Sequence, residues 1–275
     1  MDNSISTSLA GKRIAITRAA RQSAELLEKF EKLGALPTLL PLVSFAAPED
    51  FAPMDAALDQ LEQFDWIIFT SENAVRAVVK RASVRGNLRN VAGRRSRAAA
   101  VGPTTAAAAQ RAGFLVDYQA KTHSGVALAH ELGKRVQSQS ILLPRSDRAN
   151  PDLPKLLRDY GAEVTEVIAY RTVTPVNLDR DKIAGIVNGE SEALLFFSPT
   201  AVEHFAAIVG DKMLSVLQDR LAITAVGPIT ANALHQAGVK TMIVAEDTTS
   251  DAVIAALEQH FADIAKVAAA GVTKA

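Results

Sequence analysis

A long internal repeat limits the folds that this chain can adopt. The stretch VGPTTAAAAQRAGF at residues 101–114 returns as VGPITANALHQAGV at residues 226–239, so a shift of 125 positions aligns the two. A shift of 127 positions aligns identical residues elsewhere in the chain, among them Arg18 with Arg145, Ser71 with Ser198, and Val75 with Val202. Because a period of this length is the size of a domain, the repeat predicts two similar units of the same topology rather than a solenoid.

Short apolar runs alternate with segments of helical periodicity. The runs are apolar on both faces and lie at 13–17, 66–70, 97–101, 141–144, 193–197 and 221–226. The helical segments are rich in Ala and Leu and lie at 21–34, 73–83, 104–112, 151–160, 200–209 and 230–237. Four of them end at glycines that are typical of helix C-caps, namely Gly34, Gly113, Gly161 and Gly238. Strands of this kind, separated by helices, predict an α/β fold with parallel sheets covered on both faces.

Proline marks equivalent places in the two copies. The segments LPTLLPL at 36–42 and TVTPV at 172–176 are extended and contain proline, which favours connectors over central strands. The polar N-terminal ten residues and the C-terminal stretch AKVAAAGVTKA lack an amphipathic pattern. We therefore expect both ends of the chain to be loosely held.

Composition excludes several classes of protein. The chain has 275 residues, 48% of them hydrophobic, with 30 Lys and Arg against 30 Asp and Glu, so it has no overall electrostatic bias toward nucleic acid or an anionic membrane. It has no cysteine, which excludes thiol nucleophiles, disulfides and cysteine-bound metals. It has neither a signal-peptide pattern nor an apolar run of about 18 residues. We expect a cytoplasmic protein, a monomer, that binds neither nucleic acid nor membrane.

Two pairs of strand-to-helix turns carry hydroxyl side chains. Thr105 and Thr230 lie in the first helical turn of the repeated VGP motif, and Ser71 and Ser198 follow two other strands in FTSENAV and FFSPTAV. A hydroxyl beside the free N–H groups of a helix N-terminus suits binding of a carboxylate or phosphate. The alternative is that each hydroxyl only caps its helix.

Three further features could carry function. Arg18 and Arg145 each follow the first strand of a copy, where a guanidinium can bind a carboxylate, although a surface ion pair is the alternative. Tyr170 could donate a proton or a hydrogen bond from the edge of a connector, or simply pack there. The stretch from Lys80 to Arg97 contains seven Lys or Arg and no acid, which is typical of a solvated surface or of a site that attracts a polyanion.

The common motifs of nucleotide, hydrolase and metalloprotease sites are missing. Neither copy contains G-x-x-x-x-G-K, G-x-G-x-x-G after its first strand, G-x-S-x-G or H-E-x-x-H. The histidines are scattered along the chain at positions 123, 130, 204, 235 and 260, so metal ligation is not indicated. The sequence therefore predicts neither a metal nor a cofactor.

Taken in order, these motifs resemble the uroporphyrinogen-III synthase family. The resemblance rests on ILLPRSDRANPDLPKLLRDYGAEVTEVIAYRTV at 141–173, on the two strand-Ser-helix turns and on the two VGP turns, and it runs over roughly residues 11–260. It implies two similar flavodoxin-like domains joined by a two-stranded connector, with the active site in the interdomain cleft. The implied first domain comprises 1–38 and 174–275, the second comprises 43–170, and the connectors are 38–43 and 170–174.

The resemblance also implies a reaction, the cyclisation of the linear tetrapyrrole hydroxymethylbilane to uroporphyrinogen III with inversion of ring D. The path runs through an azafulvene and a spiro intermediate and needs no cofactor, because the substrate's own pyrroles supply nucleophile and electrophile. Tyr170 matches the family's cleft tyrosine and is the expected catalytic residue, assisting departure of the hydroxyl. The expected substrate-binding residues, which contact acetate and propionate groups, are Arg18, Ser71, Thr105, Arg145, Ser198 and Thr230. Glu72 and Asn73 stand where some members carry a proline and a basic residue.

Two other functions are compatible with the pattern. A duplicated α/β protein with a hinge can be a non-catalytic cytosolic binding protein for a small polyanionic ligand. A dinucleotide-dependent oxidoreductase shares the α/β pattern, but neither copy has the glycine fingerprint that such a site requires. Formation of isomer III above the spontaneous background would distinguish the enzyme from the binding protein.

Overall fold

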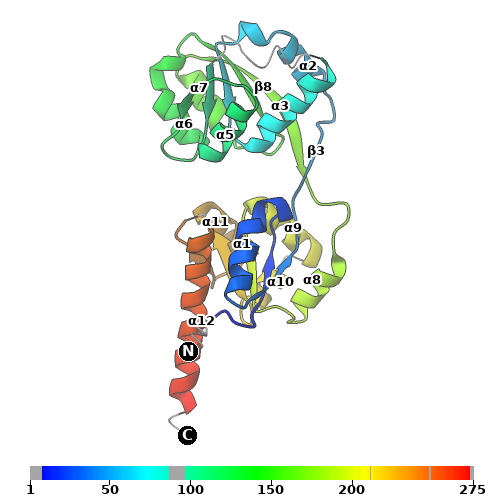
Figure 1. The fold of residues 1–275 in the computed structure, drawn as a ribbon, viewed down its shortest axis with the longest axis vertical. Helices are drawn as coiled ribbons and strands as arrows, with labels where there is room; N and C mark the ends of the chain where they lie inside the picture. The colour runs from blue at the N-terminus through cyan, green and yellow to red at the C-terminus, as the bar shows by residue number, and fades with distance from the viewer. Residues whose placement is uncertain (1–7, 87–96, 211, 248, 273–275) are drawn as a thin grey trace. The chain divides into compact units, whose positions relative to one another are not determined.

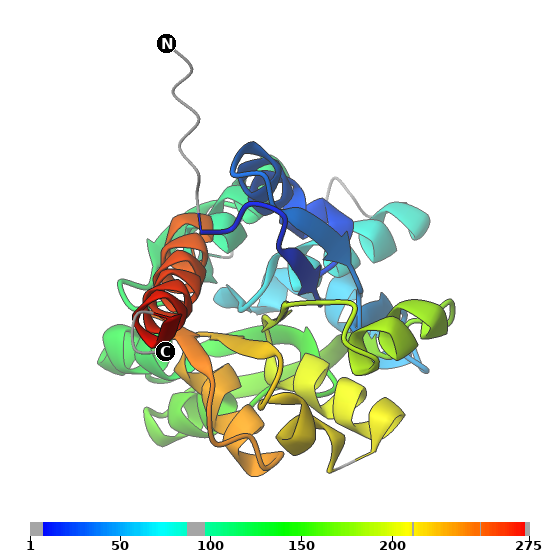
Figure 2. The ribbon, with the colours of Figure 1, turned by 90° about the horizontal axis from the view of Figure 1, so that it is seen from below.

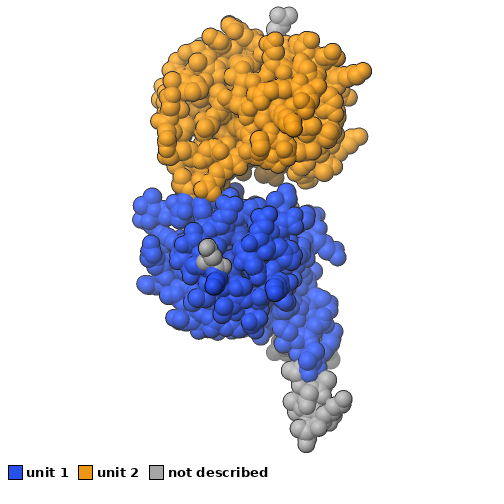
Figure 3. Space-filling model, turned by 180° about the vertical axis from the view of Figure 1, so that it is seen from behind, with its two compact units in different colours: residues 1–44, 174–275 blue, residues 45–173 orange. Residues whose placement is uncertain are grey.

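The structure is a computed structural model that describes residues 8–86, 97–210, 212–247 and 249–272. Most of the basic stretch between Lys80 and Arg97 lies outside these residues. The chain forms two compact units, Met1–Ser44 with Thr174–Ala275 (unit 1) and Phe45–Val173 (unit 2), coloured separately in Figure 3. The predicted first domain, 1–38 with 174–275, lies inside unit 1. None of the described helices is both long and apolar enough to cross a membrane.

Unit 1 is a doubly wound parallel sheet with the strand order β11-β10-β9-β1-β2. Numbered along unit 1 alone, this is the order 2-1-3-4-5 of flavodoxin-like folds. The strands are β1 (Arg13–Ile16), β2 (Leu36–Leu39), β9 (Ala193–Phe196), β10 (Ala222–Val226) and β11 (Ile243–Ala245). The helices are α1 (Ala20–Lys32), α8 (Arg180–Val187), α9 (Pro199–Val209), α10 (Met213–Leu217), α11 (Pro228–Gln236) and α12 (Ser250–Val272). Helices α1 and α12 pack on one face of the sheet and form one core with it. Helices α8, α9, α10 and α11 pack on the other face and form a second core.

Unit 2 has the strand order β3-β8-β7-β4-β5-β6, and the strands from β8 to β6 pair in parallel. The strands are β3 (Ser44–Ala46), β4 (Trp66–Phe69), β5 (Arg97–Ala100), β6 (Val116–Gln119), β7 (Ser140–Ser146) and β8 (Glu163–Val173), and the chain passes between the units at β3 and at the end of β8 (Figure 1). The helices are α2 (Ala52–Asp59), α3 (Glu72–Val84), α5 (Pro103–Arg111), α6 (Gly125–Leu132) and α7 (Asp152–Asp159), with short 3₁₀ turns at Leu61–Gln63 and Gly133–Val136. Helices α2, α3 and α5 pack on one face of the sheet, and α6 and α7 pack on the other.

The two sequence copies do not coincide with the two units. The sequence shift aligns β1 and β2 with β7 and β8, and it aligns β4 to β6 with β9 to β11. Each unit therefore combines the first two strands of one copy with the last three strands of the other. In space both units have the same strand order, so aligned residues occupy equivalent places in different units.

The predicted elements are confirmed, with two differences at segment ends. Each predicted strand and helix is present, and Gly34 and Gly161 have positive φ angles of 73° and 84°, as helix C-caps require. Residues 36–39 form an edge strand, where proline is tolerated, and Leu40 and Leu42 are fully buried in unit 1. This part of the predicted connector is therefore part of the unit 1 fold.

The C-terminal stretch AKVAAAGVTKA, at residues 265–275, is helical as far as Val272. Helix α12 runs without a break to Val272 (Figures 1 and 2). Its first half buries Val253, Leu257 and Phe261 at helical spacing, which anchors the helix to the sheet. Alanine has the highest helix propensity, so the Ala-rich continuation extends the anchored helix without needing an apolar face of its own.

Candidate functional site

The hydroxyl side chains predicted from the sequence lie at the carboxyl ends of parallel strands. In unit 2, Ser71 joins β4 to α3, and Thr105 lies in the first turn of α5, after β5. In unit 1, Ser198 joins β9 to α9, and Thr230 lies in the first turn of α11, after β10. In open α/β sheets, ligands bind at this edge, where helix N-termini present free N–H groups.

Ser71 and Ser198 cap their helices in the same way. The Ser71 Oγ accepts a hydrogen bond from the Ala74 N–H at 3.1 Å, and the Ser198 Oγ accepts one from the Ala201 N–H at 3.2 Å. Their backbones are extended, with φ and ψ of −157° and 153° for Ser71 and −160° and 153° for Ser198. The capping alternative raised by the sequence therefore applies to both serines.

Ser71 has a second partner, the phenol of Tyr170. The Ser71 Oγ and the Tyr170 hydroxyl are 3.0 Å apart, and either can be the donor. Because the Ser71 Oγ already accepts the Ala74 N–H, its own proton is available for the phenol oxygen. The shift of 127 positions aligns Tyr170 with Val43, so the equivalent position in the other copy offers no phenol to Ser198.

A β-bulge sets the direction of the Tyr170 side chain. Along β8, Val167 and Ala169 are buried and Ile168 is exposed, so strict alternation would place Tyr170 on the face of Ile168. The register with β7 shifts between Arg145 and Ser146, which pair with Ile168 and Tyr170, and leaves one extra residue on β8. Tyr170 packs instead against the core that contains Val167 and Ala169. Bulges next to functional sites commonly redirect a side chain in this manner.

The surroundings of Tyr170 hold its phenol in the protonated form. Burial is the largest influence and raises the pKa of the phenol, the hydrogen bond with Ser71 lowers it, and the negative charge of Asp147 raises it. The ring also packs edge-on against Phe45, with centroids 5.4 Å apart and an interplanar angle of 85°. The net direction of the pKa shift is upward, so the Tyr170 phenol is protonated at physiological pH.

Asp147 is a functional candidate that the sequence reading missed. Its N–H donates to the Tyr170 carbonyl at 3.3 Å, and its Oδ1 accepts the Thr172 N–H at 2.9 Å. The Ser146 hydroxyl donates to the same oxygen at 2.9 Å. Asp147 therefore holds the bulged segment of β8 at the end of β7. The signal for Asp147 in the sequence is its place directly after a strand, whereas the neighbouring Arg145 and Arg148 favour a prediction of a cationic site.

The two threonines are buried at the starts of their helices. Thr105 is 6% exposed and Thr230 is 3% exposed, and each is the third residue of a helix that begins with proline. Within the described residues, no hydrogen bond joins either hydroxyl to another group. Proline contributes no N–H, so the hydroxyl and the remaining amides are the donors that an anion would meet there.

The two arginines differ in what surrounds them. The Arg18 guanidinium lies over the Phe197 ring, 5.3 Å from its centroid, and burial lowers its pKa; no carboxylate of the described residues pairs with it. The Arg145 side chain is buried, and its guanidinium donates to Glu166 at 2.5 Å and to the Asn150 carbonyl at 2.7 Å. Arg18 thus has no carboxylate partner among the described residues, whereas Arg145 forms an internal ion pair with Glu166.

Comparisons with known proteins agree with this architecture. The family model described as Uroporphyrinogen-III synthase HemD matches residues 24–255. A uroporphyrinogen-III synthase from Synechococcus elongatus is 27% identical over 256 residues, covering 91% of this chain and 96% of the relative.

Solved structures of this family share the fold. A mutant uroporphyrinogen III synthase from Thermus thermophilus aligns with a TM-score of 0.65 at 22% identity, covering 90% of this chain and 98% of that one. The Helicobacter pylori uroporphyrinogen-III synthetase aligns with a TM-score of 0.61 at 18% identity, covering 91% and 99%. The expected α/β fold with parallel sheets is therefore confirmed. With duplicated parallel-sheet units and a family match from residue 24 to residue 255, the chain belongs to the uroporphyrinogen-III synthase family.

Proposed function

We propose that the residues described above carry out the reaction of this family, with Tyr170 as the proton donor and the helix N-termini as carboxylate sites. The reaction is the cyclisation of hydroxymethylbilane to uroporphyrinogen III in tetrapyrrole biosynthesis. The observation that carries the proposal is the contact of 3.0 Å between the Tyr170 hydroxyl and Ser71 at the start of α3. This contact puts a protonated phenol at the strand edge where α/β folds bind ligands.

The first step is loss of the substrate's hydroxyl group as water. The carbon–oxygen bond breaks with its electron pair on oxygen, the Tyr170 phenol gives its proton to that oxygen, and the pyrrole supplies electrons to form the azafulvene. The Ser71 hydroxyl donates to the phenol oxygen and stabilises the negative charge that develops on it, since its Oγ is itself held by the Ala74 N–H. A positioned general acid of this kind typically contributes about 10²–10⁴-fold to a rate.

The later steps are made by the substrate itself. The substituted carbon of ring D attacks the azafulvene to form the spiro intermediate, which fragments and recloses with ring D inverted. The proton released at the end restores the phenol, so water is the only by-product and no cofactor takes part. The protein's contribution is to hold the chain in the conformation that favours attack at the hindered carbon over direct closure to isomer I.

In this proposal each unit contains groups that can bind an acetate or propionate substituent of the substrate. Arg18 supplies an uncommitted guanidinium, and Thr105 and Thr230 supply buried hydroxyls at helix N-termini. Ser198 supplies a hydroxyl and the adjacent amides of α9. Arg145 is assigned a structural role, because binding a substrate carboxylate would require it to leave Glu166. The proposal also takes the enzyme to be a cytoplasmic monomer.

Isomer analysis tests the proposal. Freshly generated hydroxymethylbilane is incubated with the protein, and the cyclised products are oxidised and separated into isomers I and III. We expect isomer III to form above the spontaneous background, and Arg18→Gln to raise KM by about tenfold with little change in kcat. Binding of hydroxymethylbilane with only isomer I as product would instead favour the non-catalytic binding protein.

A further inference from the structure

Unit 2 contains a cavity of about 280 Å³ that Tyr170 lines and that none of the predicted substrate-binding residues lines. One side is aromatic and consists of Phe45, Phe51 and Tyr170. The other side is a face of α3 that includes Asn73, Ala77 and Lys80. The cavity thus lies beside the proposed proton donor and is built from one unit alone.

The spacing along α3 creates the space. Positions 73, 77 and 80 follow one another at intervals of four and three residues, so their side chains share one face of the helix. Ala77 is the smallest of the three and lies between the two longer side chains. The cavity depends on this small residue, because a longer side chain there would point into the same space.

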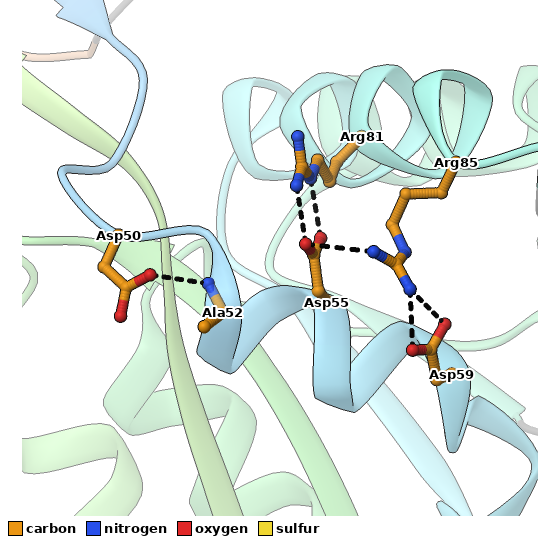
Figure 4. A network of polar contacts seen from close by, with 6 residues as sticks. All are labelled: Asp50, Ala52, Asp55, Asp59, Arg81 and Arg85. Atoms are coloured by element: carbon orange, nitrogen blue, oxygen red, sulfur yellow. Dashed lines mark hydrogen bonds and ion pairs between the residues drawn. The ribbon is translucent and has the colours of Figure 1, made fainter.

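Some of the polar side chains that line the cavity have ion-pair partners in the protein, and others have none. Arg81 pairs with Asp55 through two hydrogen bonds of 2.6 and 2.5 Å (Figure 4). It also stacks over Phe51, with its guanidinium carbon 4.1 Å from the ring centroid. Arg76 pairs with Glu72. Lys80 has no ion pair with any described residue, and the Asn73 side chain likewise has no hydrogen bond to one. These two donors therefore remain available to a ligand.

The lining suits a flat, electron-rich ring with acidic substituents. Aromatic and alanine surfaces pack against the faces of such a ring, while an ammonium and an amide bind carboxylates at its edge. Pockets for whole drug-sized ligands run to about 300–1,000 Å³, so this cavity fits one ring of a linear tetrapyrrole and not the complete chain.

We propose that this cavity is the subsite for the terminal pyrrole ring that carries the hydroxymethyl group, with Lys80 and Asn73 binding that ring's carboxylates. The inference rests on the proposed function, since it names the end of the substrate that Tyr170 serves. Placing this ring against Tyr170 puts the departing hydroxyl beside the proton donor. The neighbouring rings then extend away from the cavity.

Two variants on α3 test the subsite, each assayed with freshly generated hydroxymethylbilane. Ala77→Leu fills the cavity, and Lys80→Gln removes the cation while keeping the length of the side chain. We expect each variant to raise KM by about tenfold or more, because a charge-assisted contact or a complete subsite is lost. The matched control is Lys155→Gln, which removes an exposed lysine on α7 of the same unit, and its KM should equal that of the unaltered protein.

A monopyrrole with one acetate and one propionate substituent provides a second measurement. We expect it to inhibit the unaltered protein competitively and to inhibit Ala77→Leu at least tenfold more weakly. If Ala77→Leu lowers the melting temperature, Lys80→Gln still tests the subsite. Lys80 is exposed, so its replacement should leave the fold intact. Unchanged KM in Lys80→Gln, or the absence of competitive inhibition, would overturn the subsite while isomer III formation still upheld the proposed function. Absence of isomer III with the unaltered protein would overturn the function itself.

Discussion

Ser71 and Ser198 show how one repeated residue takes different roles in the two copies. Both cap a helix with nearly identical backbone angles, but only Ser71 meets a phenol, because Val43 occupies the position that aligns with Tyr170. The difference arises from the neighbouring strand and not from the serine. Comparison of variants at Ser71 and Ser198 therefore separates the effect of losing a helix cap from the effect of losing the contact with Tyr170.

We predict that Ser71→Ala lowers kcat more than Ser198→Ala does. Each change removes one N-cap hydrogen bond, which costs roughly 0.5–2 kcal/mol of stability. Ser71→Ala also loses the hydrogen bond with Tyr170, so its melting temperature should fall at least as far as that of Ser198→Ala. Only Ser71→Ala also removes the hydrogen bond that lowers the pKa of the Tyr170 phenol, which makes the phenol a weaker acid. Ser198→Ala should act mainly on KM. Equal values of kcat for the two variants would contradict the proposed effect of the Ser71 hydrogen bond on Tyr170.

Removal of the Asp147 charge should lower the pKa of Tyr170. The negative charge of Asp147 raises the pKa of this phenol, and Asp147→Asn keeps an oxygen acceptor for the Thr172 N–H. Ultraviolet titration of tyrosinate, with the signal of Tyr170→Phe subtracted, measures the change. Asp117→Asn, on β6 of the same unit, is the control. An unchanged titration of Tyr170 in Asp147→Asn would rule out the electrostatic influence of Asp147.

At the scale of elements, α2 holds α3 in place through a charged cluster. Asp55 on α2 lies between Arg81 and Arg85 of the α3 region, and Arg85 also reaches Asp59 (Figure 4). Helix α3 carries Ser71 at its start and the cavity face along its length. The cluster therefore ties α2 to α3, the helix that carries both Ser71 and the residues of the proposed subsite.

The Asp55 cluster should stabilise unit 2 at neutral pH and lose its effect in acid. The hydrogen bond from Arg81 is the largest influence that lowers the pKa of Asp55 below its usual value of 3.8. A carboxyl group with a lowered folded-state pKa contributes stability above its unfolded pKa, and this contribution is lost as the pH falls through the folded value. Asp55→Asn should thus lower the melting temperature by a few degrees at pH 7. The difference should shrink below pH 3.8, and a difference independent of pH would contradict this account.

The sequence predicted central elements better than edges and contacts. Runs apolar on both faces, such as 66–70, identify buried parallel strands, whereas the edge strands β2, β6 and β11 carry Pro37, Asp117 or an exposed Val244. The repeat located Ser71 and Thr105 individually. It could not predict the contact between Ser71 and Tyr170, because that contact depends on a bulge between β7 and β8, and a register shift leaves no local pattern.

At the scale of the whole molecule, the duplication is exchanged between the units. Unit 1 takes β1 and β2 from the first copy and β9 to β11 from the second, and unit 2 takes the remaining strands. Each sequence copy is thus divided between two folded units. Tyr170 and Ser71 nevertheless belong to the same unit, which makes the proposed proton donor a property of unit 2 alone.

Unit 2 should fold as an independent domain. Residues 44–173 contain every strand of its sheet and the helices of both of its cores, so a fragment of this length buries its apolar surface by itself. We expect circular dichroism of the fragment to show mixed helix and strand, with one cooperative thermal transition. A fragment that remains unfolded would mean that the cores need residues of unit 1.

The rate constant of Tyr170→Phe tests the central claim most directly. The variant keeps the ring that packs against Phe45 and removes only the hydroxyl that Ser71 contacts. The account predicts that the melting temperature changes by no more than the loss of one hydrogen bond explains. It predicts a fall in kcat of about 10²-fold or more, with isomer III as the residual enzymatic product. A kcat near that of the unaltered protein would contradict the account, because Tyr170 could not then be the group that protonates the departing hydroxyl.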